Sequence, residues 1–321
     1  MRIIEQSAEL IKHDGNPYEL IETVARTCYK SESRGNPLGF VKGLQKSGHW
    51  AMLEHEYVYF KLDGIAKYNF LNQMAPEELK FINVQQNYVS GSFRSFLELA
   101  EPYSDTEFTP SNRNNIVLVE MIRQLTVEYP DVFTFDLEDC ALKASCGTVE
   151  LMSRQNFIND IKSVGYVLED YIISALIPHT IRFITSRCIA NEIIRHRVAS
   201  YAQESTRYVG YDKDKYGSEI TVIKPLIEEN TKEYEEWKYA IEWCETVYMN
   251  LRNRNIQPQI ARGVLPQDLK AEIVVTATEQ EWQHIMDLRF HGTTGAPHPQ
   301  IKTLMGLAYP ILAEESEGRI Q

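Results

Sequence analysis

The chain alternates between short runs of β-branched and aromatic residues and longer stretches with apolar residues every three or four positions. The short runs predict strands at residues 1–6, 55–62, 180–186 and 272–278. The three- and four-residue spacing predicts helices at residues 17–29, 37–47, 230–251, 258–265, 279–288 and 299–312. Strands and helices are mixed without a regular βαβ alternation, which favours an α+β fold, a mixed sheet packed with long helices.

One further helix is predicted directly after the strand at 180–186. Ser186 is a suitable N-cap residue, because its hydroxyl can accept a hydrogen bond from the first helical turn. The last turn of this helix is expected to carry Arg195 and Arg197, where cations interact favourably with the helix dipole.

The middle of the chain, residues 63–165, has a weaker pattern. Helical segments are predicted at 68–74, 92–99 and 116–127, and the polar segment 101–115 is expected to be a loop. The segments FINVQQNYVSGSFRSFLEL and NNIVLVEMIRQLTVEY both carry apolar stripes that a helix could bury. We therefore expect this part to form a folded, mainly helical subdomain.

The composition is that of a soluble globular protein, with 43% hydrophobic and 24% charged residues. No apolar run reaches the roughly 20 residues of a membrane helix, and the N-terminal segment does not resemble a secretory signal. The net charge of −12 argues against a nucleic-acid partner. Five cysteines without a CxxC pair favour a reduced, cytoplasmic protein; they are Cys28, Cys140, Cys146, Cys188 and Cys244.

Within this acidic chain, the stretch RHRVASYAQESTRY (195–208) concentrates arginines and hydroxyls. Ser205, Thr206 and Arg207 are consecutive, and a guanidinium beside two hydroxyls suits a phosphate group. A solvated helix end with surface arginines explains the same residues, and chemistry alone leaves both interpretations open. The chain lacks the GxGxxG, GxxxxGK[ST], GxSxG and HExxH motifs, and we expect no metal site.

The stretch 195–208 resembles the signature of the flavin-dependent thymidylate synthase family, an Arg-His-Arg followed by a spaced serine, a polar pair and Ser-x-Arg-Tyr. Weaker similarities to the same family follow its order along the chain. They are ARTCY (25–29), SGHWAMLEH (47–55), IARGVLP (260–266), WQHIMDLR (282–289) and HPQ (298–300). Residues 63–165 fall between these segments. The resemblance therefore implies a core formed by 1–62 and 166–321, with 63–165 as an insertion.

The resemblance implies conversion of dUMP to dTMP, with methylenetetrahydrofolate as carbon donor and NADPH reducing a bound FAD. It also implies a homotetramer whose active sites are shared between chains. The residues that match the nucleotide-binding positions of the family are Glu192, Arg195, Gln203, Glu204, Ser205, Thr206, Arg207, Arg262 and Arg289. The residues that match its flavin-binding positions are Cys28, His49, Glu54, Arg195, His196, Arg197, Gln203, His284 and His298.

Several positions depart from the family pattern. Ala202 stands where asparagine is usual, and Glu192 stands where glutamine is frequent. Cys28 and Ala51 replace hydroxyl residues, and Thr278 and Gln280 replace asparagine and arginine on the flavin side. Arg94, in the predicted inserted part, either reaches the mouth of the site or has a surface or capping role.

Arg289 is the expected catalytic residue, because a fixed cation can stabilise negative charge that develops on the pyrimidine ring. No cysteine lies near the 195–208 motif in the sequence, and Ser205 is expected to donate to phosphate rather than attack the ring. Two alternatives stay open. One is a related flavin-dependent C5 hydroxymethylase or methyltransferase of pyrimidine nucleotides, and the other is a non-catalytic nucleotide-binding homologue.

Overall fold

The computed structural model of the chain describes residues 1–13, 15–74, 82–100, 115–135, 146–165, 168–207, 210–212 and 217–321. The loop expected at 101–115 lies outside the described residues except for Asn115, as do Cys140 and the last motif residue, Tyr208.

A four-stranded antiparallel sheet forms the centre of the molecule. Its order is β2 (Ser7–Ile11), β7 (Pro178–Ser186), β10 (Lys270–Thr278) and β8 (Ser200–Gln203). The strands at 180–186 and 272–278 are thus confirmed, and they pair along their whole length. The short strand β8 was not predicted, and it contains part of the 195–208 motif.

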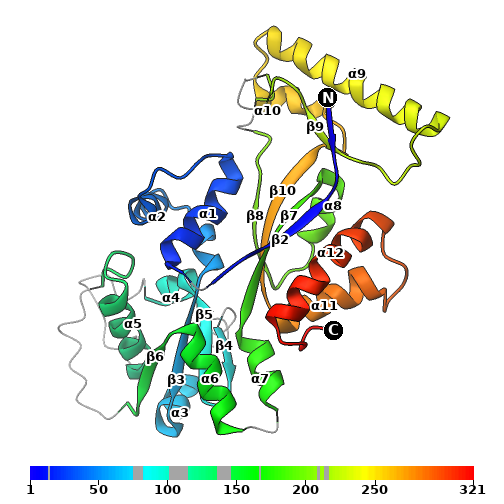
Figure 1. Ribbon diagram of the computed structural model, residues 1–321. Coiled ribbons are helices and arrows are strands. Elements are labelled where there is room, and N and C mark those ends of the chain that lie inside the picture. Colours follow the sequence, from blue (N-terminus) through cyan, green and yellow to red (C-terminus); the bar gives the residue numbers. More distant parts are fainter. Residues whose placement is uncertain are drawn as a thin grey trace.

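Helices cover both faces of this central sheet (Figure 1). On one face the buried side chains of β7 and β10 pack against α8 (Arg187–Ile193), α11 (Glu279–Met286) and α12 (Pro299–Glu315). On the other face, Leu20 and Val24 of α1 (Pro17–Tyr29) pack against Ala202 and Val274. The helix α1 begins as predicted, because Pro17 fits the first turn and the Asn16 side chain accepts from Tyr18 N.

A second four-stranded antiparallel sheet lies at one end of the molecule, below the central sheet in Figure 1. Its order is β4 (Ile82–Gln85), β5 (Tyr88–Ser92), β3 (Tyr57–Leu62) and β6 (Val149–Met152). The helices of this part are α3 (Gly64–Gln73), α4 (Phe93–Ala100), α5 (Ile116–Glu128), α6 (Arg154–Val164) and α7 (Glu169–Leu176). Phe60, Phe93 and Phe96 lie in its apolar core.

The helical interpretation of FINVQQNYVS is wrong, because these residues contribute the hairpin of β4 and β5. The hairpin turns at Gln86, whose φ of 51° is a left-handed conformation, and Val84 then pairs with Val89. The boundary between residues 62 and 63 stays a prediction. In the structure, β3 pairs on one side with β5 and on the other with β6, both of which come from the expected insertion.

A third, smaller group of elements packs around the strands β1 (Arg2–Ile4) and β9 (Thr221–Ile223), which pair in parallel. The 22-residue helix α9 (Lys232–Asn253) belongs to this group, at the end of the molecule opposite the second sheet (Figure 1). Most of its apolar stripe packs on the buried Ile220 and Val222. Tyr239 and Trp243, one turn apart, are 71% and 61% exposed.

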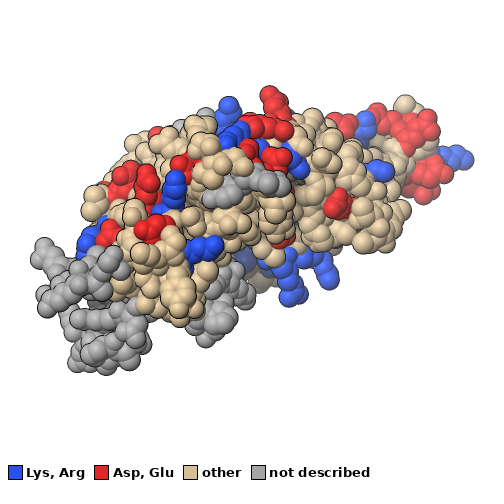
Figure 2. All heavy atoms as spheres, turned by 90° about the horizontal axis from the view of Figure 1, so that it is seen from below, with Lys and Arg blue, Asp and Glu red and all other residues tan. Residues whose placement is uncertain are grey.

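Other helices of the described part pack on these units. They are α2 (Pro37–Lys46), the 3-10 helix η1 (Trp50–His55), α10 (Pro258–Ala261), the 3-10 helix η6 (Arg262–Val264) and the π-helical turn η7 (Asp287–His291). With strands and helices mixed in this way, the α+β class is confirmed. In the face shown in Figure 2, acidic and basic side chains are interspersed, with a group of acidic residues at one end. None of the helices in the described part has the length and apolar character needed to cross a membrane.

Candidate functional site

The 195–208 motif follows α8, but the helix ends earlier than predicted. Ser186 does cap its first turn by accepting from Ile189 N. The last helical residue is Ile193, so Arg195 and Arg197 lie beyond the helix rather than in its last turn. The chain instead turns so that Tyr201 can donate to the His196 carbonyl, and it then enters β8. This early end places the motif at the edge of the central sheet.

The hydroxyl-rich end of the motif meets residues from two distant segments. Ser205 N donates to the Cys28 carbonyl at 3.0 Å, which ties the motif to the end of α1. Arg262 Nη1 donates to Thr206 Oγ1 at 3.2 Å. Arg207 N donates to Ser205 Oγ at 3.3 Å, so the three residues form a tight turn. Four of the residues expected at the nucleotide are therefore adjacent.

Glu204 is buried between these groups. Its carboxylate accepts from Lys270 Nζ at 2.6 Å, and Arg187 donates to its backbone carbonyl at 3.0 Å. A buried carboxylate that is paired in this way holds the turn in place, while its Oε1 has no hydrogen-bond partner within the described residues. The expected nucleotide contact of Glu204 stays a prediction, and its observed contacts are structural.

A second group of expected residues gathers around Arg289. Its Nε donates to His196 Nε2 at 3.1 Å, and its Nη1 lies 3.3 Å from the Glu192 carboxylate. The His284 ring meets the His196 ring edge to face, with centroids 6.3 Å apart. Burial, with Arg289 and His284 nearby, lowers the pKa of His196 to about 4. His196 is therefore neutral near pH 7 and can accept from Arg289.

Two cavities contain expected flavin-binding residues. The larger, about 530 Å³, is lined by Glu54 and Arg197 together with Ser200, Thr278 and Gln280. The smaller, about 300 Å³, is lined by Cys28 and His49 together with Ala51 and Trp50. Their volumes are typical of ligand pockets. Arg94 lines both cavities, and about a third of its side chain is exposed.

The donors of this region suit a flavin nucleotide. Arg197 offers a guanidinium group for phosphate oxygens, and Ser200 and Thr278, which carry hydroxyls, line the same cavity. Gln203 Nε2 is buried and has no acceptor within the described residues. A buried amide normally finds a partner, and a ring carbonyl or phosphate oxygen is a suitable one.

Some expected residues stay apart from these groups. His298 caps α12, where its Nδ1 accepts from Gln300 N at 3.2 Å. Arg195 is exposed beyond α8. Ala202 is 1% exposed and packs against α1, so an asparagine there would bring an amide into an apolar contact.

The structure brings Cys28 next to the motif, although the two are far apart in the sequence. Burial raises the pKa of the Cys28 thiol, and it likewise raises the pKa of Cys146 and Cys188. A thiol with a raised pKa is a poor nucleophile near neutral pH. Within the described residues, no cluster of metal-ligating side chains was found.

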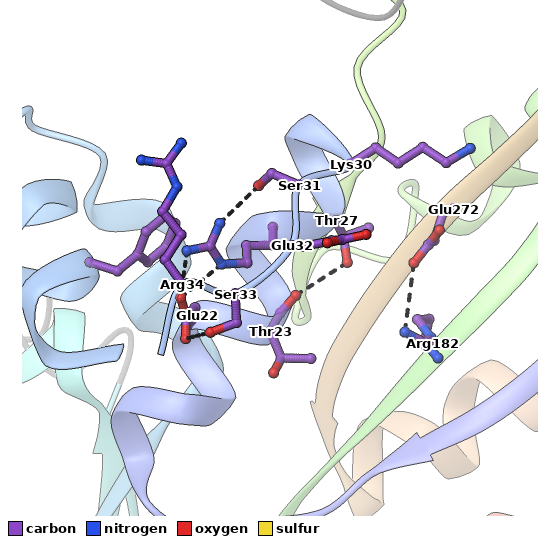
Figure 3. A pocket seen from close by; sticks show the side chains of 12 residues that line it. Glu22, Thr23, Thr27, Lys30, Ser31, Glu32, Ser33, Arg34, Arg182 and Glu272 are labelled. Atoms are coloured by element: carbon purple, nitrogen blue, oxygen red, sulfur yellow. Dashed lines mark hydrogen bonds and ion pairs between the residues drawn. The ribbon is translucent and has the colours of Figure 1, made fainter. Parts of the chain in front are cut away.

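Sequence reasoning missed a cavity of about 980 Å³, which lies between the end of α1 and the central sheet (Figure 3). Arg26 is held there by Glu22 at 2.6 Å and lies over the Phe40 ring. Arg182 and Glu272 face each other across neighbouring strands, 3.8 Å apart. Most of its lining comes from residues 22–34, which overlap the ARTCY segment (25–29), whereas Arg182 and Glu272 come from strands much later in the chain.

Comparisons with known proteins place part of the chain in context. Residues 171–315 match the family model described as thymidylate synthase complementing protein. Over 104 residues the chain is 36% identical to a flavin-dependent thymidylate synthase of Pyrococcus furiosus. The aligned residues are 32% of this chain and 42% of that protein. Over 126 residues it is 31% identical to a flavin-dependent thymidylate synthase of Thermococcus onnurineus, with 39% and 51% covered. The matches thus span about half or less of these relatives.

Among solved structures, a UMP/dUMP methylase from Streptomyces cacaoi superposes with a TM-score of 0.39 and 17% identity, covering 52% of this chain and 86% of that chain.

Proposed function

We propose that the chain is a flavin-dependent thymidylate synthase. The family-model match over residues 171–315 and the 36% identity to an enzyme of that name support this proposal. In this proposal it converts dUMP to dTMP, with methylenetetrahydrofolate as carbon donor and NADPH as reductant of a bound FAD. It acts as a cytoplasmic homotetramer with shared active sites, without nucleic-acid or membrane partners.

The observation that carries the proposal is the hydrogen bond from Arg262 to Thr206. The resemblance assigns both residues to the nucleotide, but it matches them in separate segments of the chain. Arg262 contacts Thr206 within the turn that also contains Ser205 and Arg207, so the four side chains form a single cluster of donors for a phosphate group. The contact between Arg289 and His196 joins two further segments in the same way.

The chain's own residues would act mainly by binding and polarisation. Ser205, Thr206 and Arg207 bind the nucleotide phosphate, because a guanidinium and hydroxyls together provide charge-assisted hydrogen bonds. Arg289, whose orientation is fixed by His196 and Glu192, stabilises negative charge that develops on the pyrimidine ring. The raised pKa of the Cys28 thiol argues against its addition to the ring.

Glu54 and Arg197 of the larger cavity would bind the FAD, together with Cys28 and His49 of the neighbouring cavity and the buried amide of Gln203. The chemistry that FAD supplies when bound is hydride donation after reduction. Neither of these two cavities is lined by His298 or Arg195 in the described part of the chain. Their proposed roles therefore depend on a site that is completed by another subunit.

The test is direct. The purified chain should show flavin absorbance, and reduced flavin should be oxidised when dUMP and methylenetetrahydrofolate are added. Mass analysis of the nucleotide should identify dTMP. A hydroxymethylated product, or activity with UMP alone, would instead indicate the related C5-modifying enzymes, and a protein without flavin would indicate a non-catalytic homologue.

A pair of variants tests the nucleotide cluster. Arg207→Ala should weaken dUMP binding by about tenfold or more in calorimetry, because one charge-assisted phosphate contact is lost. The matched control is Arg254→Ala, since Arg254 is exposed at the end of α9. Equal affinities for the two variants would contradict the assignment of Arg207.

A further inference from the structure

The 530 Å³ cavity is lined both by residues inside the segment that matches the family model and by residues outside it. One wall of the 530 Å³ cavity comes from residues 197–200 and 278–281, which lie in the segment that matches the family. The opposite wall comes from β4, β5 and α4, at 82–98, within the part expected to be an insertion. The cavity therefore exists only because both parts are present.

Arg94 lies at the boundary between this cavity and the 300 Å³ cavity that contains Cys28 and His49. Its Nη1 is 2.5 Å from Glu54 Oε1, and its Nε is 2.6 Å from Glu98 Oε1. About a third of the Arg94 and Glu54 side chains is exposed. Two carboxylates on different elements thus fix one guanidinium at the junction of two cavities.

The two ion pairs have different roles. Glu98 is one turn away on α4, so its contact orients Arg94 on its own helix. Glu54 belongs to η1, so its contact with Arg94 crosses from one part of the chain to the other. An arginine that is oriented on a helix can fix a partner carboxylate, because its planar fork allows few geometries.

We propose that Arg94 is a positioning residue of the flavin site, which holds the Glu54 carboxylate at the wall of the 530 Å³ cavity so that it can accept a hydrogen bond from the bound flavin nucleotide. This inference rests on the proposed function, because it takes Glu54 as a flavin-binding residue. It makes the segment 82–98 part of the site. Removal of Arg94 then acts on flavin binding through Glu54.

The experiment compares flavin binding by the full chain and its variants. Flavin is removed, and FAD is titrated back with its fluorescence and visible spectrum as readouts. We expect Arg94→Ala to weaken FAD binding by about tenfold and to shift the bound flavin spectrum, as loss of one charge-assisted contact predicts. Arg94→Lys should recover part of the affinity, because it keeps the charge but loses the fork.

A double-mutant comparison tests the route through Glu54. Glu54→Gln should weaken FAD binding about as much as Arg94→Ala does. The double variant should bind FAD with the same affinity as the single variant that binds it less tightly. Arg123→Ala is the matched control. Arg123 lies on α5, also within residues 63–165, and pairs with Glu120 at 3.2 Å, and it lines neither cavity. Its FAD affinity should equal that of the unaltered chain.

The outcomes are distinct. An unchanged FAD affinity in Arg94→Ala overturns the inference. It is also overturned if the fold-losses of FAD affinity in Arg94→Ala and Glu54→Gln multiply in the double variant. An Arg94→Lys variant that binds FAD no more tightly than Arg94→Ala overturns it as well. If the unaltered chain itself does not bind FAD, the proposed function fails, independently of Arg94.

Discussion

Arg289 donates to two different acceptors, the ring nitrogen of His196 and the carboxylate of Glu192. It lies in the π-helical turn η7, and π-helical turns frequently occur at functional sites. A neutral His196 is required for this arrangement, since a protonated ring has no free nitrogen to accept with. The low pKa of His196 therefore maintains the orientation of Arg289 across the neutral pH range.

Replacement of Arg289 by lysine tests this orientation. Arg289→Lys keeps the charge but cannot reach both acceptors, so we expect kcat to fall about tenfold or more, with a smaller change in KM. Steady-state kinetics with dUMP measures both constants. Arg254→Lys, at the exposed end of α9, should match the unaltered enzyme. An unchanged kcat in Arg289→Lys would remove Arg289 from the catalytic residues.

His55 gives a pH-dependent contribution to stability. It is fully buried, and its Nδ1 lies 2.7 Å from Thr276 Oγ1 of β10. Burial lowers the pKa of His55 to about 3, so the unfolded chain binds a proton below pH 6.5 that the folded chain does not. Stability should therefore fall as the pH drops from 6.5, by about 3 kcal/mol at pH 4 from this group.

The check is the pH dependence of the free energy of unfolding. His55→Asn removes the titrating group, so its stability should depend less steeply on pH between 6.5 and 4 than that of the unaltered chain. His291→Asn is the control, because His291 is exposed. Equal slopes for all three proteins would show that His55 is not buried in its neutral form.

Among the elements, those set by local signals were the most predictable. The helix α1 has its asparagine cap, a proline in its first turn and an apolar stripe, all within a few residues. The strand β8 depends on pairing with Ile273–Thr276 of β10, about 70 residues later, which no local pattern shows. The same holds for the site: the motif residues were found, whereas the contacts of Arg94 with Glu54 required the fold.

The helix α8 shows how an element supports the site. Ser186 caps it by accepting from Ile189 N at 3.3 Å, and the motif follows directly after its end. We expect Ser186→Ala to lower the free energy of unfolding by about 1 kcal/mol and to weaken nucleotide binding, because the first turn frays. Chemical denaturation and dUMP calorimetry measure these effects.

A second cap provides the matched control. Ser153 caps α6 in the same way, by accepting from Asn156 N at 3.3 Å, in the part of the chain that contains the second sheet. Ser153→Ala should lose a similar amount of stability without any change in nucleotide affinity. A nucleotide affinity that falls equally in both variants would indicate a general loss of stability rather than an effect of α8.

At the scale of the whole molecule, the two four-stranded sheets depend on each other. The strand β3 follows directly after η1, which reaches the central sheet through His55, and it pairs with β5 and β6 of the second sheet. Val58, Phe60 and Leu62 of β3 are buried. A strand with this many buried side chains requires its partners to remain in place.

Deletion of residues 65–166 with a short Gly/Ser linker tests this dependence. The shortened chain lacks both partners of β3, so we expect it to expose the β3 side chains and to be insoluble or unable to bind FAD. Gel filtration and flavin absorbance are the measurements. A soluble, flavin-binding product would instead support the boundaries predicted from the sequence, with 63–165 as a dispensable addition.

The helix α9 gives the molecule an optical signal of its own. Trp243 on this helix is 61% exposed, whereas Trp282 beneath the central sheet is fully buried. A soluble quencher such as iodide therefore reaches the first indole and not the second. In the proposed homotetramer, contact between subunits at α9 would shield Trp243 and shift its emission to shorter wavelength, and dilution would reverse both changes. Trp50 and Trp237 are half-buried and also emit, so the difference between the chain and its Trp243→Phe variant isolates this signal and follows the assembly of the enzyme without any label.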